Sequence, residues 1–153
     1  LITVPFDVDW TAADLGQAIP GCTVIVSFNA LTQMYCTHVV GIPYNDFSIE
    51  PGVGYFIYVT GDTSILLGGK VISEVSVSIE PIWNIIGWCQ DDNTTAGDLG
   101  LAINGTTVVV MFNAHTQQYM THVVTIPYKD FPITRGMGLF IYTSEHSQWN
   151  GYD

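Results

Sequence analysis

Residues 11–59 and 95–143 are two copies of one sequence. They align without a gap at a constant offset of about 84 residues, and roughly two-thirds of the aligned positions are identical. Identity extends through turns as well as apolar positions, because FNALTQMYCTHVV recurs as FNAHTQQYMTHVV and IPYNDF recurs as IPYKDF. The sequence therefore predicts a tandem duplication, with a first module over residues 1–68 and a second over residues 69–153. Each module is just large enough to have a core of its own.

Composition restricts the partners of such a chain. Hydrophobic residues make up 48% and charged residues 11%, which is typical of a packed chain and argues against disorder. Fourteen acidic residues against three basic ones give a net charge of −11, which disfavours nucleic acid and anionic lipid as partners. The longest apolar runs are about five residues, far below the roughly 18 that a membrane span needs. The sequence begins at Leu1 and shows neither an initial Met nor a charged-then-apolar leader, as expected of a processed chain or an excised fragment.

The elements expected in each repeat are one short helix followed by strands. Thr11 with Asp14, and Thr95 with Asp98, fit the capping box that opens a helix. β-Branched and aromatic runs then predict a hairpin and a further strand in each copy. We therefore expect a mainly β fold made of two tandem homologous modules, sandwich-like or barrel-like, each with one short helix. The period-two pattern predicts that the following residues face the module cores: Val24, Val26, Phe28, Val108, Val110 and Phe112.

The linking region contains elements that occur once for two modules. Residues 71–79 alternate as a half-buried strand, and residues 83–88 predict another. At the offset of the repeat, Leu1 falls on Ile85, so the chain is about one strand short of two complete modules. An uncovered sheet edge is a template for a strand of another copy. The residues expected to make this contact are Leu1, Ile2, Val4, Val75, Val77 and Ile79. The alternatives are that the missing strand is dispensable or lies in an extension.

The sequence WNIIGW at 83–88, followed by DLG, FN, TQxY and GxGxFIY, resembles the repeated β-rich modules of large secreted and cell-surface proteins of archaea and bacteria, which often carry a WNLIGW-like strand. The resemblance covers almost all of the second repeat and the first repeat from its helix onward. It implies spacer, adhesive or assembly units, and it carries over no catalytic residue. The first repeat departs from the pattern at its start, where Trp-Asn and Gly-Trp are missing.

Three cysteines, Cys22, Cys36 and Cys89, do not belong to the shared framework, and their spacing does not favour zinc. A hairpin turning at residues 30–33 sets Ser27 opposite Cys36 and leaves Cys22 roughly 16 Å away, which disfavours a Cys22–Cys36 bridge. The open alternatives are a disulfide of Cys22 or Cys36 with Cys89, a bond between chains, and buried free thiols.

No residue pattern indicates catalysis, a cofactor or a metal. His38 and His122 recur at equivalent positions without a second ligand nearby, which favours a hydrogen-bonded histidine on a strand face. Two acidic groups lack the spacing of a calcium loop, and capping and solvation explain them: Asp7, Asp9 and Asp14, and Asp91, Asp92 and Asp98. Three aromatic residues could stack on sugar rings but lack counterparts in the other repeat, which favours packing: Trp10, Trp149 and Tyr152.

Two N-glycosylation sequons begin at Asn93 and Asn104, both in the second repeat. Together with the acidic composition they indicate an extracellular or cell-surface glycoprotein. The expected function is that of a non-enzymatic structural protein, the subunit of a self-assembling surface fibre or layer in which copies contribute strands to one another. Its expected partners are copies of itself, with glycan as a further candidate. The alternative is a carbohydrate- or protein-binding module of a larger secreted enzyme or adhesin.

Overall fold

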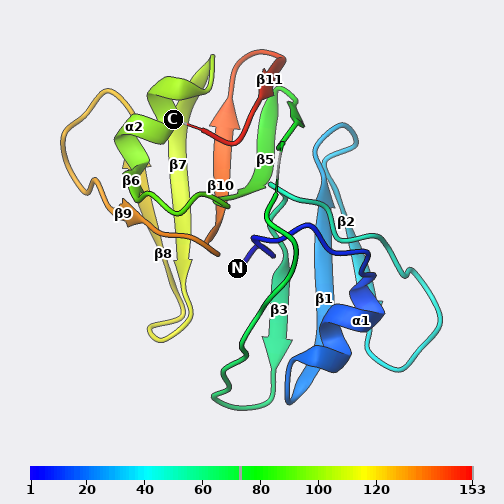
Figure 1. The fold of residues 1–153 in the computed structure, drawn as a ribbon. Coiled ribbons are helices and arrows are strands. Elements are labelled where there is room, and N and C mark those ends of the chain that lie inside the picture. Colours follow the sequence, from blue (N-terminus) through cyan, green and yellow to red (C-terminus); the bar gives the residue numbers. More distant parts are fainter. Residues whose placement is uncertain (73, 153) are drawn as a thin grey trace.

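The computed structural model describes residues 1–72 and 74–152 (Figure 1). The first module contains one helix and three strands: α1 (Ala12–Ala18), β1 (Cys22–Asn29), β2 (Met34–Val39) and β3 (Phe56–Val59). The remaining elements are β4 (Val77–Ile79), β5 (Ile82–Gly87), β6 (Thr94–Thr95), α2 (Ala96–Ala102), β7 (Thr106–Asn113), β8 (Gln118–Val123), β9 (Pro132–Ile133), β10 (Gly138–Thr143) and β11 (Ser147–Trp149). The mainly β fold with short helices is confirmed.

The duplication is preserved in space. Helix α1 corresponds to α2, strand β1 to β7 and strand β2 to β8, and each pair begins and ends at the same offset of 84 residues, as in 12 and 96 or 22 and 106. Both helices start where the sequence predicts, because the hydroxyls of Thr11 and Thr95 accept hydrogen bonds from the backbone N–H of Asp14 and Asp98. The full capping box forms at Thr11.

Each of the two modules is built on one antiparallel sheet. The first has the strand order β2-β1-β3, and the second has the order β5-β10-β7-β8. Strand β10, the counterpart of β3, therefore has a neighbouring strand on each side, β5 and β7. Among the strands of the described residues, β3 pairs with β1 alone. Two short pairs, β4 with β11 and β6 with β9, complete the second module. None of the helices in the described residues is long and apolar enough to cross a membrane.

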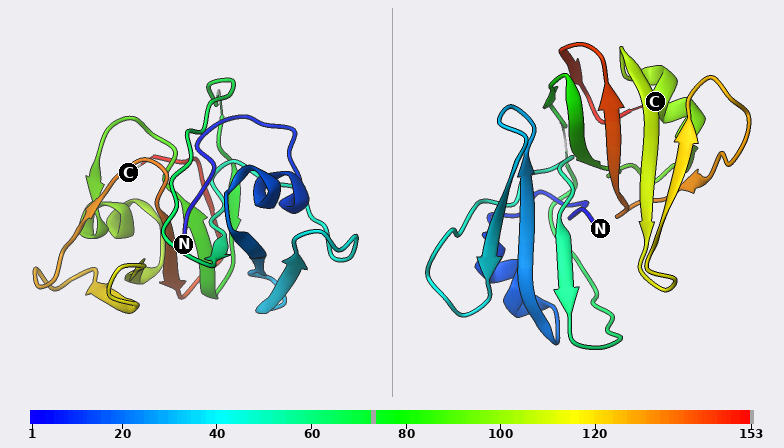
Figure 2. Two further views of the ribbon diagram at one scale, coloured as in Figure 1. Left: turned by 90° about the horizontal axis from the view of Figure 1, so that it is seen from below. Right: turned by 180° about the vertical axis from the view of Figure 1, so that it is seen from behind.

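Each helix packs on one face of its sheet and closes a core there. Leu15 and Ile25 are buried in the first core, and Leu99 and Val109 are buried in the second. In the left view of Figure 2, α1 and α2 lie on opposite sides of the molecule.

The expectation that Val24, Val26 and Phe28 face the core is wrong. Ile25 takes that place, and the other three side chains are only half-buried on the opposite face. A β-bulge between Cys22 and Val24 puts Cys22 and Ile25 on the same side, which shifts the alternation. In the second module, Val109 and Met111 pack in the core, whereas Val108 and Phe112 are half-buried outside it. Val110 is buried as expected, but it lies on the face turned toward the other module and not in this core.

The chain start lies between the modules (Figure 1) and joins them. Ile2 pairs with one residue of its own module and with one residue of the second module. Ile86, its counterpart at the offset of 84, likewise pairs with one residue of the second module and one of the first. The bridges are Ile2–Tyr55, Ile2–Met137 and Ile86–Val53, and the corresponding ladder pair is Ile86–Leu139.

Backbone hydrogen bonds repeat this exchange. The N–H of Thr3 donates to the carbonyl of Gly136 at 2.9 Å, and the N–H of Gly87 donates to the carbonyl of Gly52 at 2.7 Å. Since residues 3 and 87, and 52 and 136, are equivalent in the repeat, an approximate two-fold axis relates the modules. Thr3 and Gly87 face each other across it, and a Cβ added at Gly87 would lie 2.2 Å from Cβ of Thr3.

Candidate functional site

Aromatic side chains gather where the two sheets meet. The rings of Phe56 and Phe140, one from each module, lie 5.4 Å apart between centroids. Tyr35 packs edge-on against Phe56 at 6.4 Å, and Tyr119 packs likewise against Phe140 at 6.2 Å. Trp83 adds a further ring at 6.1 Å from Phe140. The sheet faces turned away from the helices therefore share one aromatic cluster.

A first groove of about 480 Å³ opens between the tip of the β1–β2 hairpin and the sheet of the second module. Its lining includes Phe28, Gln33, Tyr35, Trp83, Tyr119 and Phe140. Partial burial, followed by the proximity of Tyr119, raises the pKa of Tyr35 above its ordinary value. Aromatic faces with a few polar groups can hold a sugar ring or an apolar side chain.

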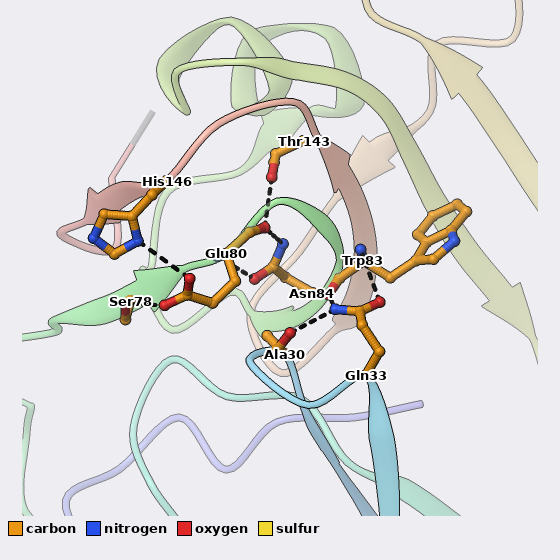
Figure 3. Close-up of polar contacts among 8 residues, drawn as sticks. All are labelled: Ala30, Gln33, Ser78, Glu80, Trp83, Asn84, Thr143 and His146. Atoms are coloured by element: carbon orange, nitrogen blue, oxygen red, sulfur yellow. Dashed lines mark hydrogen bonds and ion pairs between the residues drawn. The ribbon is translucent and has the colours of Figure 1, made fainter.

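The tip of the β1–β2 hairpin is attached to β5 through one carboxamide (Figure 3). Gln33 Nε2 donates to the backbone oxygen of Trp83 at 2.9 Å and to that of Ala30 at 2.6 Å. The backbone N–H of Trp83 donates to Gln33 Oε1 at 3.2 Å. Because both backbone polar groups of Trp83 are bonded, Gln33 takes the place of a neighbouring strand at this position of β5.

Asn84, the residue after Trp83, holds the turn before β5. Its side chain accepts from the N–H of Glu80 at 2.8 Å and donates to the carbonyl of Glu80 at 2.7 Å (Figure 3). The hydroxyl of Thr143 donates to the same carbonyl at 2.8 Å. These bonds close the turn between β4 and β5, where Ile82 has a φ of 85°. The turn positions Trp83 on the aromatic cluster.

Replacing Asn84 by alanine is expected to lower the free energy of unfolding by about 2 to 3 kcal/mol, because it removes a buried side chain that bonds two backbone groups of Glu80. Urea denaturation followed by circular dichroism measures the change. The exposed Asn104 offers a control, and its alanine variant should stay within about 0.5 kcal/mol of the parent. Equal losses for the two variants would contradict the role given to Asn84.

A second groove, of about 900 Å³, lies beside β3. The tip of the β7–β8 hairpin contributes Phe112 and Gln117, and the first module contributes Leu1, Phe56 and Tyr58. Gln117 Nε2 donates to the carbonyl of Ala114 at 2.6 Å, as Gln33 does to Ala30. Within the described residues, this carboxamide makes no second hydrogen bond.

The second groove runs along the open edge of β3. Tyr55 exchanges two backbone hydrogen bonds with Ile2, at 3.0 and 2.7 Å. In an antiparallel ladder alternate residues point their N–H and C=O the same way, so Ile57 and Val59 direct theirs outward like Tyr55. In residues 1–72 and 74–152 no strand pairs with these two positions on that side. The sequence indicated a missing strand but not the groove beside it.

The histidines and acidic groups fit structural roles. His38 and His122 are buried, with Nδ1 at 3.1 Å from the carbonyl of Tyr44 and 3.2 Å from that of Tyr128 respectively. Since a carbonyl oxygen only accepts, Nδ1 carries the proton in both rings. Asp14 and Asp98 cap the helices. Among the described residues no group of three or more His, Cys, Asp or Glu is arranged to hold a metal ion.

The remaining predicted residues lie apart from the grooves. Cys22, Cys36 and Cys89 are free thiols, so neither of the intrachain pairings with Cys89 is formed. Ser27 does lie opposite Cys36, which confirms the predicted hairpin register. Trp149 is buried and stacks on Trp88 with centroids 6.4 Å apart, so it forms no surface platform with Trp10 and Tyr152.

Asn93 and Asn104 are both exposed, one before α2 and one after it. If the chain is secreted by a host with N-glycosylation, we expect glycan on at least one of them. Intact-mass and peptide mass spectrometry of native material would detect it, with the Asn93→Gln/Asn104→Gln double variant as the control. Finding both asparagines bare would contradict this expectation.

A comparison of the chain with known protein families, curated proteins and solved structures found no match.

Proposed function

We propose that this chain is a non-enzymatic structural protein of the extracellular surface, a unit of a self-assembling fibre or layer. Copies associate by adding a strand of one chain to an open sheet edge of another. The observation that carries the proposal is the outward-facing backbone of Ile57 and Val59 on β3, whose counterpart in the second module is covered by β5. Such an edge favours strand addition through main-chain hydrogen bonds.

We place the proposed contact at a different part of the chain from the one that the sequence suggested. Strand β4, which contains Val77 and Ile79, is paired with β11 of the same chain. Val4 is buried in the first core and Val75 in the second. Leu1 and Ile2 lie between the modules. We therefore assign the contact between copies to β3 and not to these six residues.

Contacts of this kind join two different surfaces of a molecule, so they propagate into a filament unless a rotation closes the ring. Size-exclusion chromatography with light scattering, followed by electron microscopy, tests this directly. Filaments or a concentration-dependent series of oligomers support the proposal, and a monomer at all concentrations refutes it.

Replacing Tyr58 by lysine is expected to reduce association at least about tenfold, because a charge on an edge strand opposes strand pairing. Tyr58 is exposed and lies in the middle of the β3 edge region, so the fold tolerates the change. Tyr44→Lys, at an exposed tyrosine outside the strands, is the matched control. Light scattering at equal protein concentrations provides the measurement. Unchanged association of the Tyr58 variant would exclude this edge.

The aromatic groove favours a second candidate, a module that binds carbohydrate or an apolar segment of a protein. Tyr35 and Tyr119 are exposed at its rim, and each contacts a half-buried phenylalanine ring. Trp83 gives an intrinsic fluorescence signal inside the groove. Titration with oligosaccharides, with the Tyr119→Ala variant as a comparison, distinguishes this function from assembly. A monomer that binds sugar through this groove would favour the second candidate.

A further inference from the structure

The two grooves are copies of one site, and one of them lacks a part. At the offset of 84 residues, Gln117 corresponds to Gln33, Phe112 to Phe28 and Phe56 to Phe140. The exception is Trp83, because its counterpart would precede Leu1. The groove that contains Trp83 measures about 480 Å³, and the groove without such a residue measures about 900 Å³.

The surface on which Trp83 packs is repeated beside β3. The indole lies 6.1 Å from the ring of Phe140 and 5.2 Å from that of Tyr142, edge-on to both. Phe56 and Tyr58 are the corresponding residues of the first module. Tyr142 is 37% exposed under Trp83, whereas Tyr58 is 66% exposed. Two aromatic rings are therefore arranged for an indole that the described residues do not supply.

The backbone clamp is also repeated. Gln33 bonds both the N–H and the C=O of Trp83 while its Nε2 contacts Ala30. Gln117 has the same contact with Ala114, and its carboxamide lies at the groove beside β3.

We propose that the groove beside β3 binds one extended strand from outside the described residues, antiparallel to β3, with a tryptophan opposite Tyr58. The register follows from the second module, where Trp83 pairs with Tyr142 and Asn84 pairs with Ile141. The residue after the tryptophan lies opposite Ile57, and Gln117 bonds both backbone groups of the tryptophan. The inference rests on the proposed strand contribution and names the sequence that the acceptor edge selects.

The probe is the acetylated and amidated peptide Pro-Ile-Trp-Asn, which copies residues 81–84 and carries no net charge. In a titration followed by ¹⁵N-resolved NMR, the backbone amides of Ile57 and Val59 and the side-chain amide of Gln117 should shift. A peptide with alanine in place of tryptophan should bind at least about tenfold more weakly, because it loses the aromatic contacts.

Two variants with matched positions test the clamp. Gln117→Ala should weaken binding of the peptide about three- to tenfold, since it removes one hydrogen-bonding partner. Gln33→Ala changes the same residue in the other hairpin, whose strand is already in place, and should leave the affinity unchanged. Equal affinity of the Gln117 variant and the parent chain would overturn the assignment.

A blocked chain identifies the groove. Adding Ile-Trp-Asn before Leu1 places these three residues opposite Val59, Tyr58 and Ile57, in the register of β5 on β10. The blocked chain should no longer bind the peptide. Undiminished binding, or shifts that map to the groove of Trp83, would overturn the proposal.

The remaining outcomes also decide. If the shifts at Ile57 and Val59 depend on protein concentration alone and the peptide adds nothing, a strand without tryptophan from another copy fills the edge, and the selectivity proposed here is wrong. If the peptide binds as expected but the chain stays monomeric, the inference stands and the proposed assembly fails. The peptide titration and the light-scattering experiment are therefore separate tests.

Discussion

Replacing Leu99 by alanine is expected to lower the free energy of unfolding by about 3 to 5 kcal/mol. Leu99 is fully buried in the second core, where α2 packs on β7. Truncation removes apolar contacts and leaves a cavity that the surrounding strands fill only in part. Leu15→Ala, the same change at the equivalent position of the first core, should cost a similar amount. Urea denaturation with circular dichroism measures both losses.

Leu101 on the same helix provides the control. Its side chain is 71% exposed, so Leu101→Ala should stay within about 0.5 kcal/mol of the parent. Loss of less than about 1 kcal/mol for Leu99→Ala would show that the core is not packed as described. Residue-specific hydrogen exchange adds a further readout, since the separate hydrophobic clusters predict that each variant loosens its own module most.

Replacing Gly87 by threonine is expected to destabilise the chain by about 3 kcal/mol, because the new Cβ would lie 2.2 Å from Cβ and Oγ1 of Thr3, far inside van der Waals contact. The double variant Thr3→Gly/Gly87→Thr should recover most of this loss. The approximate two-fold axis makes positions 3 and 87 equivalent, so exchanging their residues restores the same pair in the opposite order.

A double-mutant cycle measured by thermal denaturation gives the coupling between the two positions. Thr3→Gly alone loses the hydroxyl bond of 2.7 Å to the carbonyl of Val53 and should cost about 1 to 2 kcal/mol. Additive losses in the double variant would contradict the two-fold relation. A coupling of about 2 kcal/mol or more would support it.

The repeat allowed much of the fold to be predicted. Identical residues through the turns meant that the two hairpins had to share a register, and Ser27 opposite Cys36 confirms the predicted one. The helix starts followed from Thr11 and Thr95, whose capping depends only on residues three positions away. Both features are determined locally, which is why one sequence contained enough information.

The side of the sheet that faces the core could not be predicted in the same way. Val24 and Val26 line the second groove and Phe28 lines the first, so their apolar pattern alone looks like that of a core strand. A bulge next to Cys22 then shifts the alternation, and the sequence does not mark it.

The grooves themselves depend on contacts between distant residues. Gln33 and Trp83 are fifty positions apart, and no local pattern predicts their pairing. A signal was nevertheless present, because Gln and Tyr of the hairpin tip are kept in both repeats although the tip could accept many residues: Gln33 and Gln117, and Tyr35 and Tyr119. The pairing of β4 with β11 was missed because both strands are only three residues long.

The contact between Thr3 and Gly87 shows what covalent duplication makes available. In a dimer of identical subunits, a position on the symmetry axis meets its own copy, so either two threonines would collide or two glycines would leave a gap. Joining the halves in one chain allows the two positions to hold different residues. A single threonine side chain then fills the space at the axis, with glycine opposite it. The fused pair can thus pack its centre more closely than a symmetric dimer of either half.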